Sequence, residues 1–172
     1  AQLSNAGSLA VTGAGLLTVA ASGSGNLAVN GGGSLASSSG IKLVSALGDL
    51  NIGSQSFTGP TSLQAGGQVN ILNGALLTGL GATSSLSISG LGLNSAAGSI
   101  TDFASITVDP TTIFNAGRLQ SRTTFSATAS DLVISGGGTI EGTTAINLTA
   151  TDVTGATINF TGSQSFKGGP VT

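Results

Sequence analysis

The chain has 172 residues, and its 39% of hydrophobic residues and mean hydropathy of +0.42 are too high for a disordered chain, although 29 residues are Gly. Only 6% of the residues are charged and the formal net charge is −2, which excludes the basic patch that binding to nucleic acid or an anionic membrane requires. Neither His nor Cys occurs, so the usual zinc ligands and the usual serine and cysteine catalytic triads are missing, and we expect no cofactor.

Short segments in which apolar residues alternate with other residues recur along the whole chain. They predict β-strands with one buried face, because successive side chains of a strand point to opposite faces. Most are soon followed by Gly, Ser, Asn or Asp, which favour turns. In chain order the apolar pairs are Leu9/Val11, Leu17/Val19, Leu27/Val29, Leu50/Ile52, Val69/Ile71, Leu86/Ile88, Ile106/Val108, Leu132/Ile134, Ile146/Leu148 and Ile158/Phe160.

The spacing of these strands predicts an all-β fold, a three-sided parallel β-solenoid (β-helix). In the denser stretches the strands begin about seven residues apart, so three sides give coils of about 21–22 residues and about eight coils in all. A coiled coil would also have an apolar residue every seven positions, but Gly and β-branched residues at this density disfavour helix. No apolar run is long enough for a transmembrane helix.

A longer repeat is superimposed on the coils. Residues 5–9 resemble residues 115–119, and residues 53–59 resemble residues 162–168, at an offset of about 110 residues. We interpret residues 1–172 as a single solenoid segment with a tandem superrepeat, in which 1–110 is the first copy and 111–172 a partial second copy. Five coils of about 22 residues would fill one copy.

The two ends of the chain lack the features of solenoid caps. Neither residues 1–14 nor residues 155–172 contain an amphipathic helix or a charged lid, and an open terminal coil would expose a sheet edge. We therefore expect copies of the chain, or flanking solenoid repeats, to stack end to end.

Segments such as Gly7–Val11, Gly25–Val29, Gly48–Ile52 and Ala145–Leu148 give the chain a family resemblance. It resembles the haemagglutination repeats of filamentous-haemagglutinin-type adhesins and the autotransporter passengers of bacteria. The resemblance implies a right-handed β-helix, secretion to the cell surface, and a role in adhesion or surface structure. It also implies host or neighbour-cell surface glycans or proteins as partners.

Few side chains could carry acid–base chemistry. Asp109, Asp131 and Asp152 are each about one coil apart, so they could form an acidic column that binds calcium or lines a saccharide cleft. We favour the alternative that they are corner residues, since Asp tolerates turns. Arg118 and Arg122 could clamp an anion, but solvation or pairing with a nearby carboxylate is the more common role.

The sequence therefore predicts a protein without enzymatic activity. The leading hypothesis is a structural shaft or building block of a large extracellular bacterial adhesin or surface filament. A second hypothesis is a polysaccharide- or ice-binding module, in which a regular Thr-x-Thr ladder would favour ice. Thr149/Thr151 and Thr157/Thr161 do not form such a ladder. A third is a β-helical polysaccharide hydrolase or lyase that uses paired carboxylates.

Overall fold

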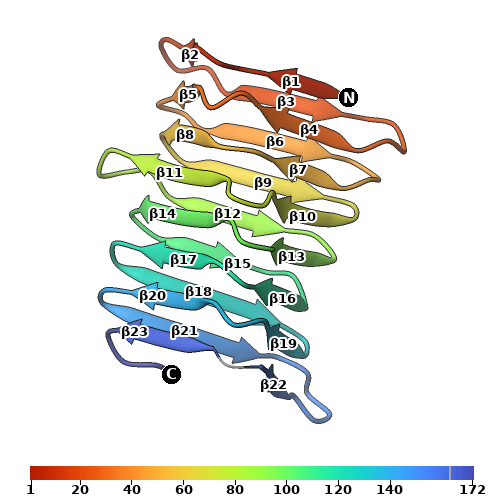
Figure 1. Ribbon diagram of the computed structural model, residues 1–172, viewed down its shortest axis with the longest axis vertical. Helices are drawn as coiled ribbons and strands as arrows, with labels where there is room; N and C mark the ends of the chain where they lie inside the picture. The colour runs from red at the N-terminus through yellow and green to blue at the C-terminus, as the bar shows by residue number, and fades with distance from the viewer. Residues whose placement is uncertain (163) are drawn as a thin grey trace.

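The protein is a β-solenoid of three all-parallel sheets, as the computed structural model shows for residues 1–162 and 164–172 (Figure 1). The described residues contain 23 short strands and no helix, and hence no helix that could cross a membrane. Coils 1–7 each contribute one strand to each sheet, the last coil contributes strands to two of them, and the coils stack along the long axis of the molecule from the N-terminus to the C-terminus. The predicted all-β, three-sided solenoid of about eight coils is confirmed.

The strands fall into three sheets, named A, B and C in the order in which the chain visits them. Sheet A contains β1 (Gln2–Ser4), β4 (Leu27–Asn30), β7 (Leu50–Ile52), β10 (Gln68–Ile71), β13 (Gly92–Ser95), β16 (Thr112–Asn115), β19 (Leu132–Ser135) and β22 (Ile158–Thr161). Sheet B contains β2 (Ser8–Val11), β5 (Ser34–Ser37), β8 (Gln55–Thr58), β11 (Leu76–Leu80), β14 (Ser99–Phe103), β17 (Arg118–Ser121), β20 (Thr139–Gly142) and β23 (Ser165–Gly168).

Sheet C closes each coil. It contains β3 (Leu17–Ala21), β6 (Ile41–Ser45), β9 (Thr61–Ala65), β12 (Leu86–Ser89), β15 (Ile106–Val108), β18 (Thr124–Ala129) and β21 (Ala145–Ala150). Coil 1 is thus β1–β3, coil 2 is β4–β6, and so on to coil 8, which is β22 and β23. We name the connections between sheets the AB, BC and CA corners.

Coil length varies more than the predicted 21–22 residues. Paired residues of neighbouring coils are 19 residues apart at Ile52 and Ile71 but 26 apart at Leu132 and Ile158. Except for one irregularity between β14 and β17, the paired strands keep their register, and the corners absorb the difference. The BC corner, for example, is residues 59–60 in coil 3 but residues 81–85 in coil 4.

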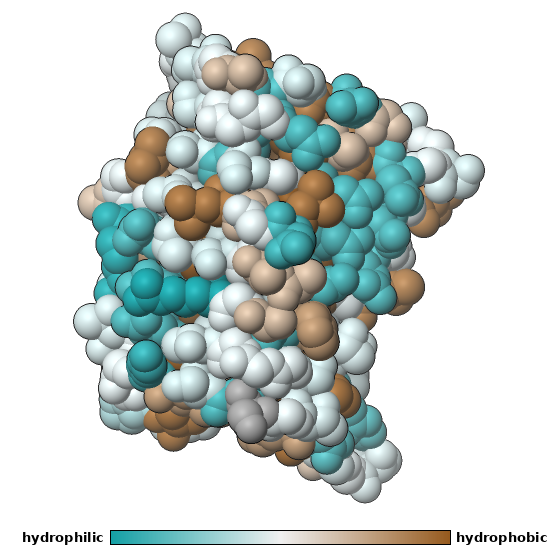
Figure 2. Space-filling view, in the orientation of Figure 1, coloured by the Kyte–Doolittle hydropathy of each residue, from teal (hydrophilic) through white to brown (hydrophobic). Residues whose placement is uncertain are grey.

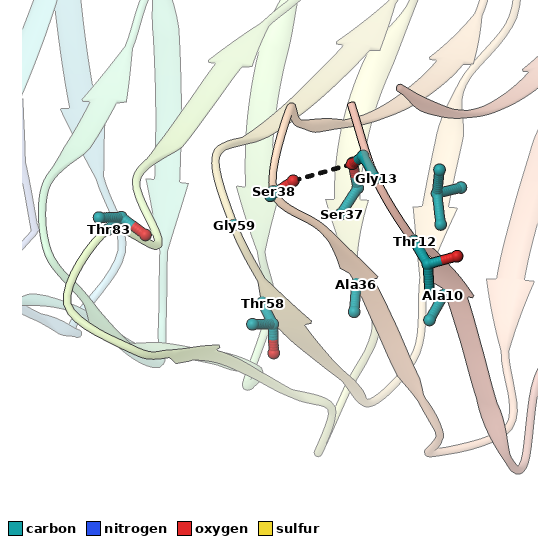
Figure 3. A pocket seen from close by; sticks show the side chains of 10 residues that line it. Ala10, Thr12, Gly13, Ala36, Ser37, Ser38, Thr58, Gly59 and Thr83 are labelled. Atoms are coloured by element: carbon teal, nitrogen blue, oxygen red, sulfur yellow. Dashed lines mark hydrogen bonds between the residues drawn. The ribbon is translucent and has the colours of Figure 1, made fainter. Parts of the chain in front are cut away.

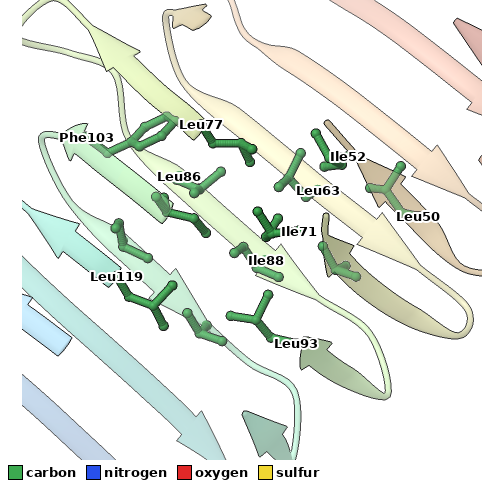
Figure 4. Close-up of a cluster of buried hydrophobic side chains, with 14 of the residues drawn as sticks. Leu50, Ile52, Leu63, Ile71, Leu77, Leu86, Ile88, Leu93, Phe103 and Leu119 are labelled. Atoms are coloured by element: carbon green, nitrogen blue, oxygen red, sulfur yellow. The ribbon is translucent and has the colours of Figure 1, made fainter. Parts of the chain in front are cut away.

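One apolar core runs through the middle of the stack (Figure 4). All ten predicted apolar pairs lie in strands, and in the central coils both members point inward. Like residues stack on like: Ile52 pairs with both Val29 and Ile71 in neighbouring coils. In coil 8 the inward-facing Phe160 is still 49% exposed, because it lies at the open end of the stack.

Sheet B adds a second kind of core packing. Gly79 pairs with Phe57 in the coil before it, and a Cβ at Gly79 would lie 2.7 Å from the ring of Phe103 in the coil after it. The two rings are 6.0 Å apart between centroids and tilted by 40°. The absence of a side chain at Gly79 therefore lets two Phe side chains from alternate coils approach each other.

Candidate functional site

The outer faces of the sheets carry rows of short polar side chains, one from each coil. On sheet B, paired outward residues form a row of hydroxyls over the first five coils, namely Ser8, Ser34, Ser56, Thr78 and Thr101. On sheet C a second row consists of Ser62, Ser87, Thr107 and Ser126. Neighbouring strands of a sheet are about 4.8 Å apart, so each row repeats a hydroxyl at that spacing along the axis.

Sheet A carries an amide row instead of hydroxyls. Asn51, Asn70 and Asn94 are paired on successive coils, and all three are partly exposed. The Nδ2 of Asn70 donates a hydrogen bond of 2.9 Å to the Oδ1 of Asn51. Figure 2 shows that hydrophilic and neutral residues cover most of the visible surface, with hydrophobic residues in small separate areas. The surface can therefore offer hydrogen bonds at regular intervals.

A groove of about 520 Å³ lies where sheet B meets the BC corner of coils 1–4 (Figure 3). Outward side chains of Ala10, Ala36 and Thr58 lie on its floor, one from each of coils 1–3. Thr12 and Gly13 border it on one side and Thr83 on the other. The groove exists because the BC corners of coils 1 and 4 are longer than the corners of coils 2 and 3 that they flank.

The corner of the groove is held by hydrogen bonds between coils. The hydroxyl of Ser38 donates to the carbonyl oxygen of Gly13 at 3.0 Å (Figure 3). The buried hydroxyl of Ser37 donates to the carbonyl oxygen of Gly15 at 2.6 Å and accepts from the amide of Gly40 at 3.2 Å. These bonds satisfy backbone groups that the turn removes from the sheets.

The three aspartates of the predicted acidic column lie at the CA corner of successive coils. Asp109 follows β15, Asp131 precedes β19, and Asp152 follows β21. Two of the carboxylates accept hydrogen bonds from nearby threonines: Asp131 from the amide and hydroxyl of Thr157, at 3.0 and 2.9 Å, and Asp152 from those of Thr154. These bonds fit the corner role that we favoured.

The hydrogen bonds of Asp152 lower the pKa of its carboxyl. The backbone amide of Thr154, and then its hydroxyl, lower the pKa of the Asp152 carboxyl below its ordinary value of 3.8, since both stabilise the charged form. Among residues 1–162 and 164–172, no three His, Cys, Asp or Glu side chains lie close enough together to hold a metal ion. Binding of calcium or saccharide by the column stays a prediction.

Arg118 and Arg122 have different partners. Arg118 forms an ion pair with Glu141 in the next coil, with 2.6 Å between Nη2 and Oε2. Arg122 donates instead to the carbonyl oxygen of Gly81, two coils away on the BC corner. The structure thus separates the two arginines, and neither arrangement is a clamp in which both hold one anion.

The superrepeat segments contribute buried amides at the AB corner. Nδ2 of Asn5 donates to Gln55 Oε1 at 3.3 Å, across two coils. At the corresponding corner five coils later, Gln164 Nε2 donates to the carbonyl oxygen of Asn115 at 3.4 Å. Ser163, which belongs to the second copy of the matching segment, lies outside the described residues, and the division into copies stays a prediction.

The sequence interpretation missed the hydroxyl rows and the groove. The rows could have been found, because the outward residue between the two apolar positions of each predicted strand is often Ser, Thr or Asn. The groove had no such signal, since it depends on the lengths of corners in neighbouring coils. In comparisons with protein-family models, curated proteins and solved structures, none matched the chain.

Proposed function

We propose that the chain is a non-catalytic structural shaft of a large extracellular bacterial adhesin or surface filament. The observation that supports this proposal best is the pairing of coils on all three sides along the described length. Each coil seals the apolar face of the next and satisfies its backbone hydrogen bonds, so the product is a rod whose length scales with the number of coils. Eight coils at about 4.8 Å each give a rod of roughly 40 Å.

The secreted location is supported by the family resemblance of the sequence. The surface is compatible with a secreted location, because outward Ser, Thr and Asn side chains can hydrogen-bond to water although few residues are charged. The four cationic side chains are too few to suggest a binding site for a polyanion.

Electron microscopy of cells that make the protein tests the proposal, with an antibody against the chain as label. Labelled rods that start at the outer membrane indicate an adhesin shaft, and long uniform fibres indicate a filament. Label confined to the cytoplasm contradicts the proposal. Turnover of a polyuronide that is lost in the Asp131→Asn variant would also contradict it, because it would make the protein an enzyme.

The hydroxyl rows favour a second candidate function, the binding of an extended polysaccharide along sheet B or sheet C. A flat row of hydroxyls can exchange hydrogen bonds with a sugar chain that lies parallel to the solenoid axis. Residues two apart on sheet C, such as Ser62 and Gln64 or Ser87 and Ser89, do not form the regular Thr-x-Thr ladder that would favour ice.

Co-sedimentation with insoluble polysaccharides tests this second function. We expect a Ser87→Lys/Thr107→Lys variant to lose binding if sheet C is the surface, and a Ser56→Lys/Thr78→Lys variant if it is sheet B. The matched control is Asn70→Lys on sheet A, which should bind like the parent. Equal binding by all four proteins would contradict a role for either hydroxyl row.

A further inference from the structure

The ten charged side chains are segregated to different parts of the solenoid. The CA corner carries four aspartates and no cation, namely Asp49, Asp109, Asp131 and Asp152. Sheet B and the BC corner carry three of the four cations, Arg118, Arg122 and Lys167, together with Asp102 and Glu141. The fourth cation, Lys42, lies on the outer face of sheet C. The CA corner is therefore an acidic edge, and the opposite side has a small positive excess.

The same two edges also differ in shape and polarity. Leu47 and Leu91 lie on the CA corner, and each is 69% exposed. The groove with the Ala10, Ala36 and Thr58 floor lies on the other edge, at the BC corner. An exposed Leu side chain is costly in water, and a groove lined by small residues can accept one. Leu47 and Leu91 thus lie at the end of sheet C opposite the groove, although the BC corner has an exposed Leu of its own, Leu16 at 54%.

Features of the CA corner and of the BC corner lie at matching positions along the solenoid axis. Leu47 lies between coils 2 and 3, which supply Ala36 and Thr58 to the floor of the groove. Asp109 lies between coils 5 and 6, and Arg122 is at the BC corner of coil 6. A second copy displaced along the direction of the sheet C strands, without rotation, would bring its Leu47 to the height of the groove and its Asp109 to the height of the Arg122 backbone, from which the Arg122 side chain extends to the carbonyl oxygen of Gly81. An antiparallel copy would instead place the aspartates of coils 5–8 against the uncharged groove.

We propose that solenoids of this chain associate side by side with parallel axes, the CA corner of one copy against the BC corner of the next. The contact joins two different surfaces by a translation, so it does not close on itself and can extend into a row. The pairing of Asp109 with Arg122 favours the parallel orientation, although an exposed pair contributes little energy and is screened by salt. This inference goes beyond a structural shaft, because it requires only the solenoid fold and assigns a partner to its sides.

Disulfide trapping tests the geometry directly, since the chain contains no Cys. We expect the Leu47→Cys/Thr58→Cys variant to form a ladder of dimers, trimers and larger species on mild oxidation. The matched control is Leu47→Cys/Ala28→Cys, in which Ala28 faces outward on sheet A, and it should form no species above the dimer. A test variant that stays monomeric or stops at the dimer, or a control that forms the same ladder, would overturn the proposal.

Sedimentation velocity at several concentrations tests the charge pairing. We expect Asp109→Lys and Arg122→Glu each to weaken association by roughly two- to tenfold at low salt, and the double variant to regain most of it, because the swapped charges attract again. Circular dichroism of each variant checks that the coils remain folded. The proposal is overturned if both single variants associate as strongly as the parent. It is also overturned if the loss of affinity in the double variant equals the two single losses combined.

Discussion

Sheets A and B bury different kinds of side chains, although both contribute one strand to every coil. In sheet A, strands β4, β7, β10 and β19 each bury two large apolar residues, as in Leu50 and Ile52. In sheet B, strands β5, β8, β11, β17 and β20 each bury one large apolar residue and one small or polar residue, as in Leu77 and Gly79. The core is therefore filled mainly from sheets A and C.

The last inward residue of sheet B is not of the same kind in every coil. It is the fully buried Phe57 in β8 and Phe103 in β14, but a small residue in β5, β11, β17 and β20. Among these small residues, the hydroxyls of Ser37 and Ser121 donate hydrogen bonds to carbonyl oxygens of neighbouring coils. Gly79 leaves room for the ring of Phe103. A strand of this solenoid can therefore have only one large inward side chain. Its second inward residue then either forms a hydrogen bond at the corner, as Ser37 does, or leaves room for a side chain from a neighbouring coil, as Gly79 does.

Truncation of a sheet A residue should have the largest effect on stability. Ile52 is fully buried and stacked between Val29 and Ile71, so Ile52→Ala should lower the free energy of unfolding by roughly 2–5 kcal/mol through lost burial and a cavity. Urea denaturation followed by circular dichroism measures the change. The control Ser87→Ala, on the outer face of sheet C, should change it by less than about 0.5 kcal/mol.

Addition of a methyl group to sheet B should have the next largest effect. A Cβ at Gly79 would lie 2.7 Å from ring atoms of Phe103 and 2.8 Å from its Cα, so Gly79→Ala should cost roughly 1–3 kcal/mol by overpacking. The matched control is Gly23→Ala, whose Cβ would meet no atom within 4 Å. Equal stability of the two variants would show that the space at Gly79 is not needed.

Removal of a corner hydroxyl should have a smaller effect. Ser37→Ala deletes the bonds to the carbonyl oxygen of Gly15 and from the amide of Gly40, so it should lower the free energy of unfolding by about 1 kcal/mol. Ser56→Ala, on the outer face of sheet B, is the control and should be close to neutral. If Ser37→Ala stabilised the protein, sheet B would lack the corner function that distinguishes it from sheet A.

The smallest effect concerns the CA corner, which belongs to neither sheet. The pKa of Asp152 is lowered in the folded protein, so the stability that this carboxylate contributes is present above its unfolded pKa and is lost as the pH falls through the folded pKa, in a window below about 4. An NMR titration of the Asp152 carboxyl measures the pKa directly. Thr154→Val removes the hydroxyl but keeps the amide, so the pKa should rise only part of the way, whereas an unchanged pKa would exclude the hydroxyl as a cause.

The sequence alone determined the all-β solenoid, the three sides and about eight coils. It did so because pairs such as Leu50 and Ile52 show the two-residue period of a strand and recur at the spacing of a stacked coil. It identified the strands of sheets A and C more readily than those of sheet B, where Gly79 or Ser37 replaces the second apolar residue. It also spaced Asp109, Asp131 and Asp152 one coil apart, which proved sufficient to place them on one corner.

Only the tertiary structure decided where corners of different length come together. The groove beside Ala36 and Thr58 exists because two long BC corners flank two short ones, and no local sequence pattern encodes that relation. The same holds for the contact between Phe57 and Phe103, which requires Gly79 in the coil between them. Alternation of apolar and polar residues along a strand is a local property, so it can be read from the sequence. Grooves and ring contacts instead depend on the register between coils that are distant in sequence.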